Sequence, residues 1–287
     1  MNDYILYTDS ACDLPEALLA RLGVRYRPLT FAFEGEDEHA DHDVPVKDFY
    51  AKMRAGGVAK TAAINTESFR EAFEEEIAAG HDILYIAFSS GLSTTYNSGR
   101  FALADLSDKY PERKLVAVDS LCASAGFGLL VYLAAEKMAE GATLEEVKKF
   151  VLDTRLHICH WFTVDDLVYL KRGGRISPAA TLIGTMLGIK PVLHVDDEGH
   201  LVNVSKARGR QASIRALADH YGELALDKKN GTVFISHGDC LEDAEALRDM
   251  LAEEYGAKVE LITDIGPVIG AHSGPGTLAL FFVGSAR

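Results

Sequence analysis

Residues 82–98 read DILYIAFSSGLSTTYNS, which is the pattern of a buried strand that runs into a helix. The apolar residues 83–88 suit a short strand covered on both faces. Five hydroxyl side chains and Gly91 follow in residues 89–95, and a helix is expected over 94–109. Free backbone N–H groups and the positive end of a helix dipole meet there, which favours a bound carboxylate or phosphate. The alternative is that Ser93 or Thr94 only caps the helix, although a cap needs a single hydroxyl.

The first half of the chain alternates strand and helix patterns. Strands are expected at 4–8, 24–33, 83–88 and 114–118, and helices at 15–22, 45–55, 66–79, 94–109 and 123–140. This alternation predicts a parallel sheet covered by helices, with a ligand crevice at the carboxyl ends of the strands. Polar residues follow three of the strands, at 8–10, 89–91 and 119–120.

The second half has a different order of elements. After a helix at 144–154, strands are expected at 157–164, 190–195, 201–207, 232–237, 259–264 and 278–283, with helices at 178–187, 211–222 and 241–254. The turn at 196–199 implies an antiparallel strand pair. We therefore predict a mixed sheet with helices on one face. The two expected domains, 1–155 and 156–287, pack tightly with a cleft between them.

Composition and charge narrow the class of protein. The chain has 287 residues, 48% of them hydrophobic and 25% charged, which is typical of soluble globular proteins. Its net charge of −14 argues against nucleic acid and anionic lipid surfaces as partners. The cysteines are scattered without CxxC spacing, which suits reduced thiols. With no secretory leader pattern and no apolar run long enough to cross a bilayer, a cytoplasmic location is predicted.

Basic residues near two glycine turns form a second group of candidates. Lys171, Arg172 and Arg175 surround a Gly-Gly pair, and Lys206 and Arg208 fall at the end of an expected strand. They are either solvated surface charges or one basic rim that suits a phosphate, and the sequence favours the rim slightly.

A rigid loop and a threonine complete the candidates from the residues themselves. The loop 266–277 is rich in glycine and proline and contains His272, so it either positions a functional group or is a tight crossover around a core histidine. Thr61 is either a helix-entry hydroxyl or a second neutral donor to the anion, which its spacing does not decide. The polar run 39–43 resembles a metal site but is expected to be solvated. No phosphate loop, GxSxG or GxGxxG pattern is present, so neither a metal nor a cofactor is predicted.

Several motifs together point to a family. They are TDSACDLP at 8–15, SSGLS at 89–93, VDS at 118–120, YLKRGGRIS at 169–177, KP at 190–191 and the loop 266–277. The chain resembles the DegV family of bacterial fatty-acid-binding proteins, the lipid-carrying (FakB-type) subunits of fatty acid kinase. The resemblance implies an α/β fold of two domains. An N-terminal three-layer α/β/α domain with a four-strand parallel sheet is followed by a domain with a mixed six-strand sheet, as in the substrate domain of dihydroxyacetone kinase.

The resemblance also implies a function and site residues. A long-chain fatty acid would lie in a tunnel between the domains, and a separate kinase would phosphorylate it to an acyl-phosphate for phospholipid synthesis. The chain itself would not be an enzyme. The carried-over positions are Thr61, Ser93, Thr94 and His272 at the carboxylate, Asn65, Arg172 and Arg175 near the head group, and Lys206 and Arg208 at the kinase.

Two departures from the family pattern affect the head-group positions. The family often has Thr-Ser-Gln-Pro-Ser where this chain has TAAIN at 61–65, and often glycine where this chain has Thr94. Candidate tunnel-lining residues are Phe88, Leu92, Leu167, Leu182, Ile183, Met186, Leu187 and Ile189. Two other functions stay open at this point, namely a hydrolase or transferase that uses Ser93 with His272, and a sensor of a small polar acid.

Overall fold

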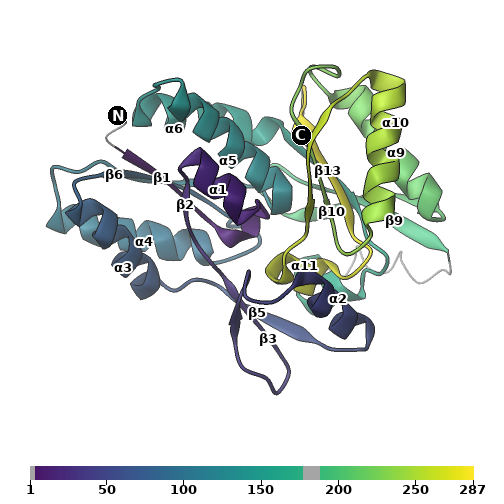
Figure 1. The fold of residues 1–287 in the computed structure, drawn as a ribbon, viewed down its shortest axis with the longest axis horizontal. Coiled ribbons are helices and arrows are strands. Elements are labelled where there is room, and N and C mark those ends of the chain that lie inside the picture. Colours follow the sequence, from purple (N-terminus) through teal and green to yellow (C-terminus); the bar gives the residue numbers. More distant parts are fainter. Residues whose placement is uncertain (1–3, 177–187) are drawn as a thin grey trace.

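A computed structural model describes residues 4–176 and 188–287 of the chain. The two larger β-sheets lie side by side and helices cover them, as Figure 1 shows. The expected helix 178–187 lies outside the described residues.

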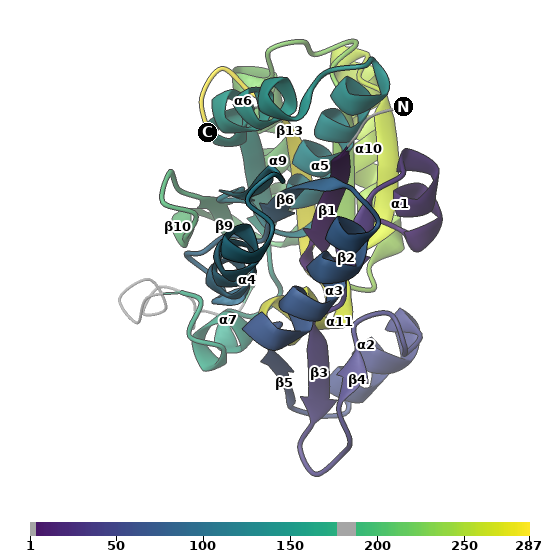
Figure 2. The same ribbon diagram turned by 90° about the vertical axis from the view of Figure 1, so that its left-hand side faces the viewer.

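The N-terminal sheet is parallel throughout, as predicted, with the strand order β2-β1-β6-β7. Its strands are β1 (Tyr4–Asp9), β2 (Arg25–Arg27), β6 (Asp82–Ala87) and β7 (Leu115–Asp119). Helices α3 (Thr66–Ala78) and α4 (Thr95–Lys109) cover one face, and α1 (Glu16–Leu22), α5 (Ser124–Ala139) and α6 (Leu144–Thr154) lie on the other (Figures 1 and 2). Burial from both sides explains the uninterrupted apolar run in β6.

The prediction of a single strand at 24–33 is wrong. This segment forms two strands, β2 and β3 (Thr30–Phe33), because Pro28 between them has no N–H to donate to a strand ladder. β3 belongs to a separate antiparallel sheet, ordered β4-β3-β5, which also contains β4 (His39–Ala40) and β5 (Ala59–Ala62). Phe31 and Phe33 of β3 pack on Phe49 of α2 (Val46–Arg54), with ring centroids 5.2 and 5.4 Å apart. This small sheet places Thr61 beside Phe31.

The C-terminal sheet has six strands in the order β10-β9-β8-β13-β11-β12, and its mixed character is confirmed. Its strands are β8 (Ile158–Thr163), β9 (Ile189–Val195), β10 (Leu201–Arg208), β11 (Val233–His237), β12 (Val259–Asp264) and β13 (Leu278–Val283). The β9–β10 pair is antiparallel, as the 196–199 turn predicted, whereas β11 and β12 run parallel. Helices α9 (Arg210–Leu224) and α10 (Leu241–Tyr255) cover one face.

Three short helices that the sequence patterns did not predict connect these elements. They are η1 (Ser10–Cys12), α7 (Val168–Arg172) and α11 (Pro267–Ser273), and the 3₁₀ turn η2 (Arg155–His157) extends α6. α11 is formed by the glycine-rich segment that was expected to be a loop.

Helix α5 joins the two sheets into one core. It packs against η1 on one side and against β8, β11 and β13 on the other. Two glycines permit this position, because a Cβ at Gly128 would lie 2.5 Å from the Cys12 carbonyl oxygen and one at Gly126 would lie 2.4 Å from His160 Nε2. The apolar core is therefore continuous from the N-terminal sheet to the C-terminal sheet.

Candidate functional site

A cavity of about 560 Å³ lies where the two sheets and α11 meet. The loops after β6 and β7 form one wall, the inward faces of β8 and β13 form the opposite wall, and β5 and α11 close a side. Its lining residues include Thr61, Phe88, Leu92, Ser93, Thr94, Ser124, His160, Phe162, Leu170, Arg175, Val195, Leu201, Val268, Ile269, His272, Ala279 and Phe281. The crevice predicted at the carboxyl ends of the parallel strands is therefore present.

The charge of the cavity lining differs sharply from the charge of the chain. The sequence contains 43 acidic residues and has a net charge of −14. Among the described residues, no Asp, Glu or Lys side chain lines the cavity, and Arg175 is its one arginine. The polar groups at the cavity are hydroxyls, two histidines and this guanidinium. This environment suits an anionic group attached to an apolar body, and it repels no negative charge.

A buried carboxylate, that of Asp9, holds the end of β6 where the hydroxyl-rich loop begins. Asp9 Oδ2 accepts hydrogen bonds from the Phe88 N–H and the Tyr85 hydroxyl, each at 3.0 Å. Burial raises the pKa of the Asp9 carboxyl to about 7, against the opposing effect of these donors. These bonds fix the end of β6 and therefore the start of the hydroxyl-rich loop.

The β9–β10 turn of the C-terminal half also contacts the hydroxyl-rich loop after β6. The Ser89 hydroxyl donates to the Gly199 carbonyl oxygen at 2.9 Å. A Cβ at Gly91 would lie 2.9 Å from the carbonyl oxygens of both Glu198 and Gly199, so only glycine fits at this position. One of the five hydroxyls counted in the sequence, that of Ser89, therefore joins the two halves of the protein.

Ser93 lines the cavity and lies one residue before Thr94, the N-cap of α4. Its Oγ accepts a hydrogen bond from the N–H of Thr95, the first residue of α4, at 3.2 Å, and lies 2.8 Å from Thr95 Oγ1. When Thr95 donates in the second contact, the Ser93 hydroxyl hydrogen is free to point into the cavity. The Thr94 side chain makes no cap bond, and its N–H finds no acceptor within the described part of the chain. Neutral donors at the start of α4 thus face the cavity.

Thr61 and His272 meet at the opposite side of the cavity. Thr61 Oγ1 lies 2.8 Å from His272 Nε2, and both side chains line the cavity. A Cβ at Gly173 would lie 2.2 Å from His272 Nδ1, so that glycine makes room for the ring. Burial, together with the nearby positive charge of Arg175, lowers the pKa of His272 to about 4. The imidazole is therefore neutral at physiological pH.

Arg175 connects these two groups of donors. Its Nε donates to the Leu92 carbonyl oxygen at 3.1 Å, and its Nη1 donates to the Gly173 carbonyl oxygen. Burial of the guanidinium lowers its pKa, although arginine stays charged in proteins. Arg175 therefore places one positive charge between the hydroxyl-rich loop and His272.

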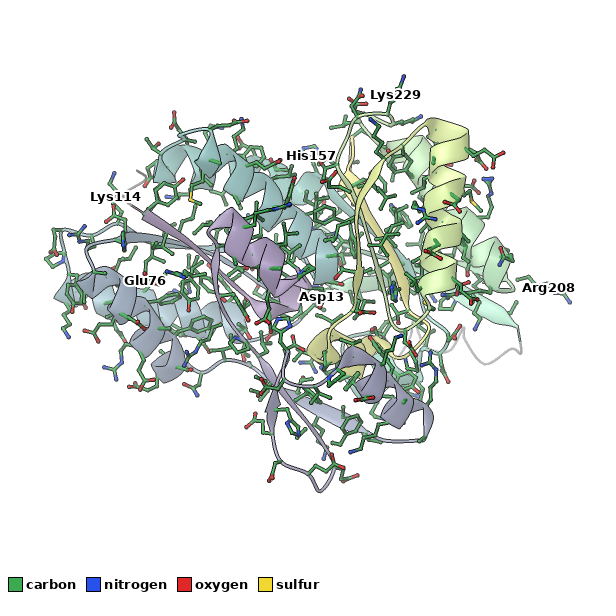
Figure 3. All side chains as sticks on the ribbon, in the orientation of Figure 1. Asp13, Glu76, Lys114, His157, Arg208 and Lys229 are labelled. Carbon is green, nitrogen blue, oxygen red and sulfur yellow. The ribbon has the colours of Figure 1, made fainter. Side chains whose placement is uncertain are left out.

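Four of the residues expected at the site or at a kinase do not line the cavity. Asn65 caps α3 by accepting the Ser68 N–H at 2.8 Å. Arg172 is exposed and lies over the Tyr169 ring, 5.8 Å from its centroid. Lys206 and Arg208 are exposed on β10, and Figure 3 shows Arg208 pointing outward at the edge of the molecule.

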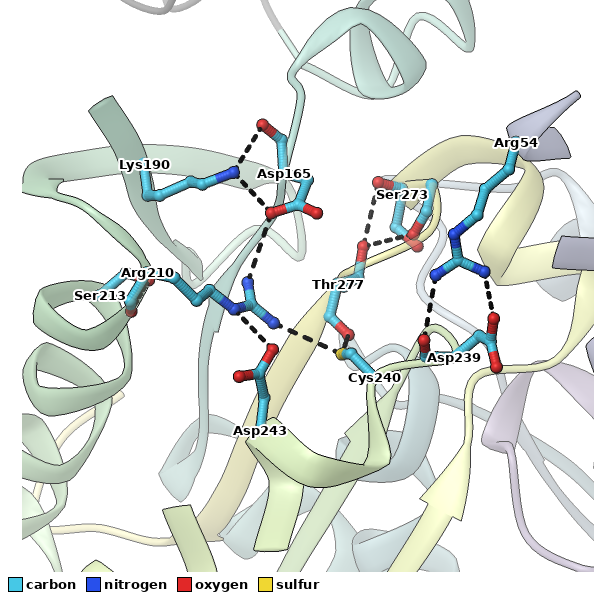
Figure 4. A network of polar contacts seen from close by, with 11 residues as sticks. Arg54, Asp165, Lys190, Arg210, Ser213, Asp239, Cys240, Asp243, Ser273 and Thr277 are labelled. Atoms are coloured by element: carbon cyan, nitrogen blue, oxygen red, sulfur yellow. Dashed lines mark hydrogen bonds and ion pairs between the residues drawn. The ribbon is translucent and has the colours of Figure 1, made fainter. Parts of the chain in front are cut away.

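The structure places only part of the expected basic rim at the cavity. Of the five basic residues expected there, Arg175 alone lines it. The neighbouring Arg210, the first residue of α9, is paired with acidic side chains. The Arg210 Nε donates to Asp243 Oδ2 at 2.8 Å, and Asp165 lies nearby (Figure 4).

Of the candidate tunnel residues, Phe88 and Leu92 line the cavity and Leu167 and Ile189 do not. The other four, Leu182, Ile183, Met186 and Leu187, lie outside the described residues.

Two buried carboxylates beside the site were missed by sequence reasoning. Asp41 was expected to be solvated within the polar run 39–43, but it is 1% exposed and accepts the Val268 N–H at 2.8 Å. Asp13 is 4% exposed and accepts the Gly266 N–H at 2.9 Å. Asp13 falls in a motif that resembled the family, whereas no local pattern around Asp41 signals burial. Within the described ranges, no three His, Cys, Asp or Glu residues are grouped to hold a metal ion.

Comparison with known proteins identifies the family. The sequence profile described as "Uncharacterised protein, DegV family" matches residues 5–285. The chain belongs to the DegV family. It is 43% identical to a DegV domain-containing protein of Clostridium perfringens, over 100% of this chain and 99% of the relative.

Solved DegV structures share the fold over nearly the full length of the chain. A DegV protein from Thermus thermophilus, described as binding fatty acid, has a TM-score of 0.89 and 30% identity and covers 98% of this chain and 99% of its own. A DegV lipid-binding protein from Thermotoga maritima has a TM-score of 0.87 and 29% identity, with 100% of both chains covered. In the described part of this DegV chain, no helix is long and apolar enough to cross a membrane.

Proposed function

We propose that this DegV-family chain is a cytoplasmic carrier that binds a long-chain fatty acid in the cavity between domains 1–155 and 156–287. The carboxylate is held by the hydroxyls of Thr61 and Ser93 and by the Thr94 N–H. His272 and Arg175 complete the head-group site. The acyl tail lies against the apolar lining.

The observation that carries this proposal is the cavity lining, which combines neutral donors with an apolar remainder and, among the described residues, contains no carboxylate side chain. A carboxylate taken from water costs several kcal/mol unless it is hydrogen-bonded, and hydroxyls, a free N–H and a guanidinium supply such bonds. Each buried CH₂ contributes roughly 0.8 kcal/mol, so a tail of about sixteen carbons adds substantial affinity. The volume of about 560 Å³ falls within the usual range of ligand pockets, roughly 300–1,000 Å³.

The family adds independent support for this ligand class. The solved relatives from Thermus thermophilus and Thermotoga maritima are described as fatty-acid-binding and lipid-binding proteins, and their TM-scores to this chain are 0.89 and 0.87. The two matches cover 100% and 98% of this chain, so they include the residues that line the cavity in nearly full-length alignments.

The contacts of His272 argue against the alternative of a hydrolase. A serine nucleophile needs a base within hydrogen-bond reach. His272 Nε2 is instead paired with Thr61 at 2.8 Å, and Ser93 Oγ is paired with Thr95 at 2.8 Å. Because the Ser93 side chain bonds to Thr95 and to no histidine among the described residues, we propose that the chain presents its fatty acid to a separate kinase. By resemblance, this chain is the FakB-type lipid-carrying subunit. The separate kinase transfers the terminal phosphoryl group of ATP to the carboxylate, and the exposed Lys206 and Arg208 contact that kinase.

Extraction and mass spectrometry test the ligand. The protein, purified without detergent, is denatured in organic solvent, and the extract is quantified against the protein. We expect a near-stoichiometric long-chain fatty acid. A polar acid in its place, or protein that takes up no fatty acid even after incubation with hexadecanoate, would contradict the proposal.

A further inference from the structure

Helix α11, which carries His272, has an unusual start. It has seven residues, and the residue before it, Gly266, has no side chain with which to cap the helix. The first N–H groups of a helix have no partner within the helix, so other groups must satisfy them when they are buried. Here the partners come from distant parts of the chain. The Gly266 N–H donates to Asp13 Oδ1 at 2.9 Å, and the Val268 N–H donates to Asp41 Oδ1 at 2.8 Å.

A tyrosine makes a third contact with the same end of α11. The Tyr50 hydroxyl donates to the Ile265 carbonyl oxygen at 2.9 Å. A Cβ at Gly270 would lie 2.5 Å from the Tyr50 oxygen, so glycine at this position lets the helix lie directly on the tyrosine. We call Asp13, Asp41 and Tyr50 the α11 clamp.

The α11 clamp is buried and joins the two halves of the protein. Asp13, Asp41 and Tyr50 are 4%, 1% and 0% exposed. Asp13 follows η1, Asp41 follows β4 and Tyr50 lies in α2, so all three belong to the N-terminal half, whereas α11 belongs to the C-terminal half. Figure 3 shows Asp13 at the junction of the two halves.

Asp13 also connects the clamp to the cavity wall. Its Oδ2 accepts the Ser124 hydroxyl at 2.5 Å, and Ser124 lines the cavity at the start of α5. Its main-chain oxygen accepts the Thr263 hydroxyl at 3.2 Å. Burying two carboxylates is costly, and the hydrogen bonds that they accept from Gly266, Val268 and Ser124 offset part of that cost. Packing alone could have held α11 at a lower cost, so these carboxylates point to a role in setting its position.

We infer that the α11 clamp positions His272, by docking α11 onto the N-terminal half so that the imidazole meets Thr61 at the head-group site. The inference rests on the proposed function, because the consequence for binding requires that site. Asp13, Asp41 and Tyr50 are positioning residues. They do not line the cavity, and they act on a ligand only through α11.

Asp41 gives the sharpest test, because the same loop supplies a matched control. Asp43 Oδ2 accepts the Ala40 N–H at 3.1 Å, which is a similar bond that does not involve α11. The binding of hexadecanoate to delipidated protein is measured by calorimetry for Asp41→Ala, Asp41→Asn and Asp43→Ala. We expect Asp41→Ala to raise the Kd about tenfold, since a buried N–H loses its acceptor. Asn keeps an acceptor oxygen, so Asp41→Asn restores most of the affinity, and Asp43→Ala leaves the Kd within about twofold.

Two further readouts separate positioning from general stability. The ring signals of His272 in NMR spectra of the ligand-free protein should shift in Asp41→Ala and stay in place in Asp43→Ala. In a His272→Ala background, Asp41→Ala should cause a much smaller further loss of affinity, because the group that it positions is gone. An unchanged His272 spectrum, or a full additional loss in that background, overturns the inference.

A milder pair of variants covers the case in which Asp41→Ala does not fold. Tyr50→Phe removes only the hydroxyl bond to α11, and Tyr4→Phe removes a comparable bond to the Ala142 carbonyl oxygen, 3.0 Å long and away from the cavity. The inference predicts a weaker Kd and a shifted His272 signal for Tyr50→Phe alone, and equal behaviour of the two variants contradicts it. If wild-type protein binds no hexadecanoate, the proposed function fails, whereas the His272 spectra still test the clamp.

Discussion

His272 Nε2 lies 2.8 Å from Thr61 Oγ1, and this contact joins segments 211 residues apart in the sequence. Thr61 belongs to β5 in the N-terminal half, and His272 belongs to α11 in the C-terminal half. The candidate head-group site is therefore complete only when the two halves are docked. Because burial keeps His272 neutral, the ring can support a hydroxyl that donates to an anion without adding a second buried charge.

Removal of the Ser93 hydroxyl should weaken fatty acid binding. Ser93→Ala takes away one neutral donor at the cavity and leaves the apolar walls unchanged, so we expect the Kd for hexadecanoate to rise about tenfold. Calorimetry on delipidated protein measures this. Ser107→Ala is the control, because Ser107 lies on the same helix and donates to the Leu103 carbonyl oxygen at 2.8 Å, away from the cavity. Equal affinities of the two variants would show that Ser93 does not contact the ligand.

Arg175 should affect both the ligand and His272. Arg175→Gln removes the positive charge that helps to hold the pKa of His272 at about 4, so this pKa should rise. The loss of a charge-assisted bond to the carboxylate should also raise the Kd about tenfold. An NMR titration of His272 and a binding isotherm provide the two readouts. Arg172→Gln, on the exposed side of α7, should change neither, and an unshifted His272 pKa in Arg175→Gln would contradict the assigned electrostatics.

Gly173 should tolerate no side chain while His272 is present. The Cβ of Gly173→Ala would lie 2.2 Å from His272 Nδ1, so the ring or α7 must move. Overpacking of this kind typically costs about 1–3 kcal/mol of stability. Thermal unfolding should therefore show a lower Tm for Gly173→Ala than for wild type. In a His272→Ala background the same substitution should cost little, and a full cost there would mean that the clash lies elsewhere.

Asp9 should make stability fall as the pH rises. Its carboxyl pKa is raised to about 7, well above the ordinary value near 4, so between these values the folded state holds a proton that the unfolded state has lost. The free energy of unfolding therefore decreases with increasing pH across this window, by at most about 1.4 kcal/mol per pH unit, and levels off above it. Asp9→Asn cannot titrate. The difference in unfolding free energy, variant minus wild type, should grow from pH 4 to pH 7, and denaturant titrations that give a pH-independent difference would refute this assignment.

The kinase contact calls for charge variants that leave the ligand site intact. Lys206→Ala with Arg208→Ala should keep the Kd for hexadecanoate and should slow ATP-dependent phosphorylation of the bound fatty acid by a bacterial fatty acid kinase catalytic subunit. The rate should fall several-fold and lose much of its salt dependence, since charges at the rim of an interface act mainly on association. Lys229→Ala is the control, because Lys229 is exposed at a distant loop (Figure 3). An unaffected rate in the double variant places the kinase elsewhere.

The larger elements were predictable because their patterns are local. β6 is a continuous apolar run and α3 has a clear apolar stripe, so length and periodicity were sufficient. β5 and α11 were missed for the opposite reason. β5 has four residues and α11 has seven, and segments this short depend on tertiary contacts such as the β3 ladder and the α11 clamp.

The site residues also divide into those with a local sequence pattern and those that depend on tertiary contacts. The hydroxyl-rich loop containing Ser93 could be read from a strand followed by a helix. Thr61 and His272 were candidates with alternatives left open, and only the resemblance to a family assigned them to the carboxylate. Asp41 could not be found from its neighbours in sequence, because its partner Val268 lies 227 residues away. Its polar surroundings suggest solvent, and only the packing of α11 buries it.

The position of the bound carboxylate tests the central claim most directly. Hexadecanoate with an isotope-labelled carboxyl carbon is added to delipidated protein, and NMR contacts from that carbon are assigned to protein protons. The account predicts contacts with Ser93, Thr94 and Thr61, and a carboxyl signal shielded from solvent. A carboxyl carbon that contacts none of these residues, or that stays exposed to water while the tail is bound, would contradict it.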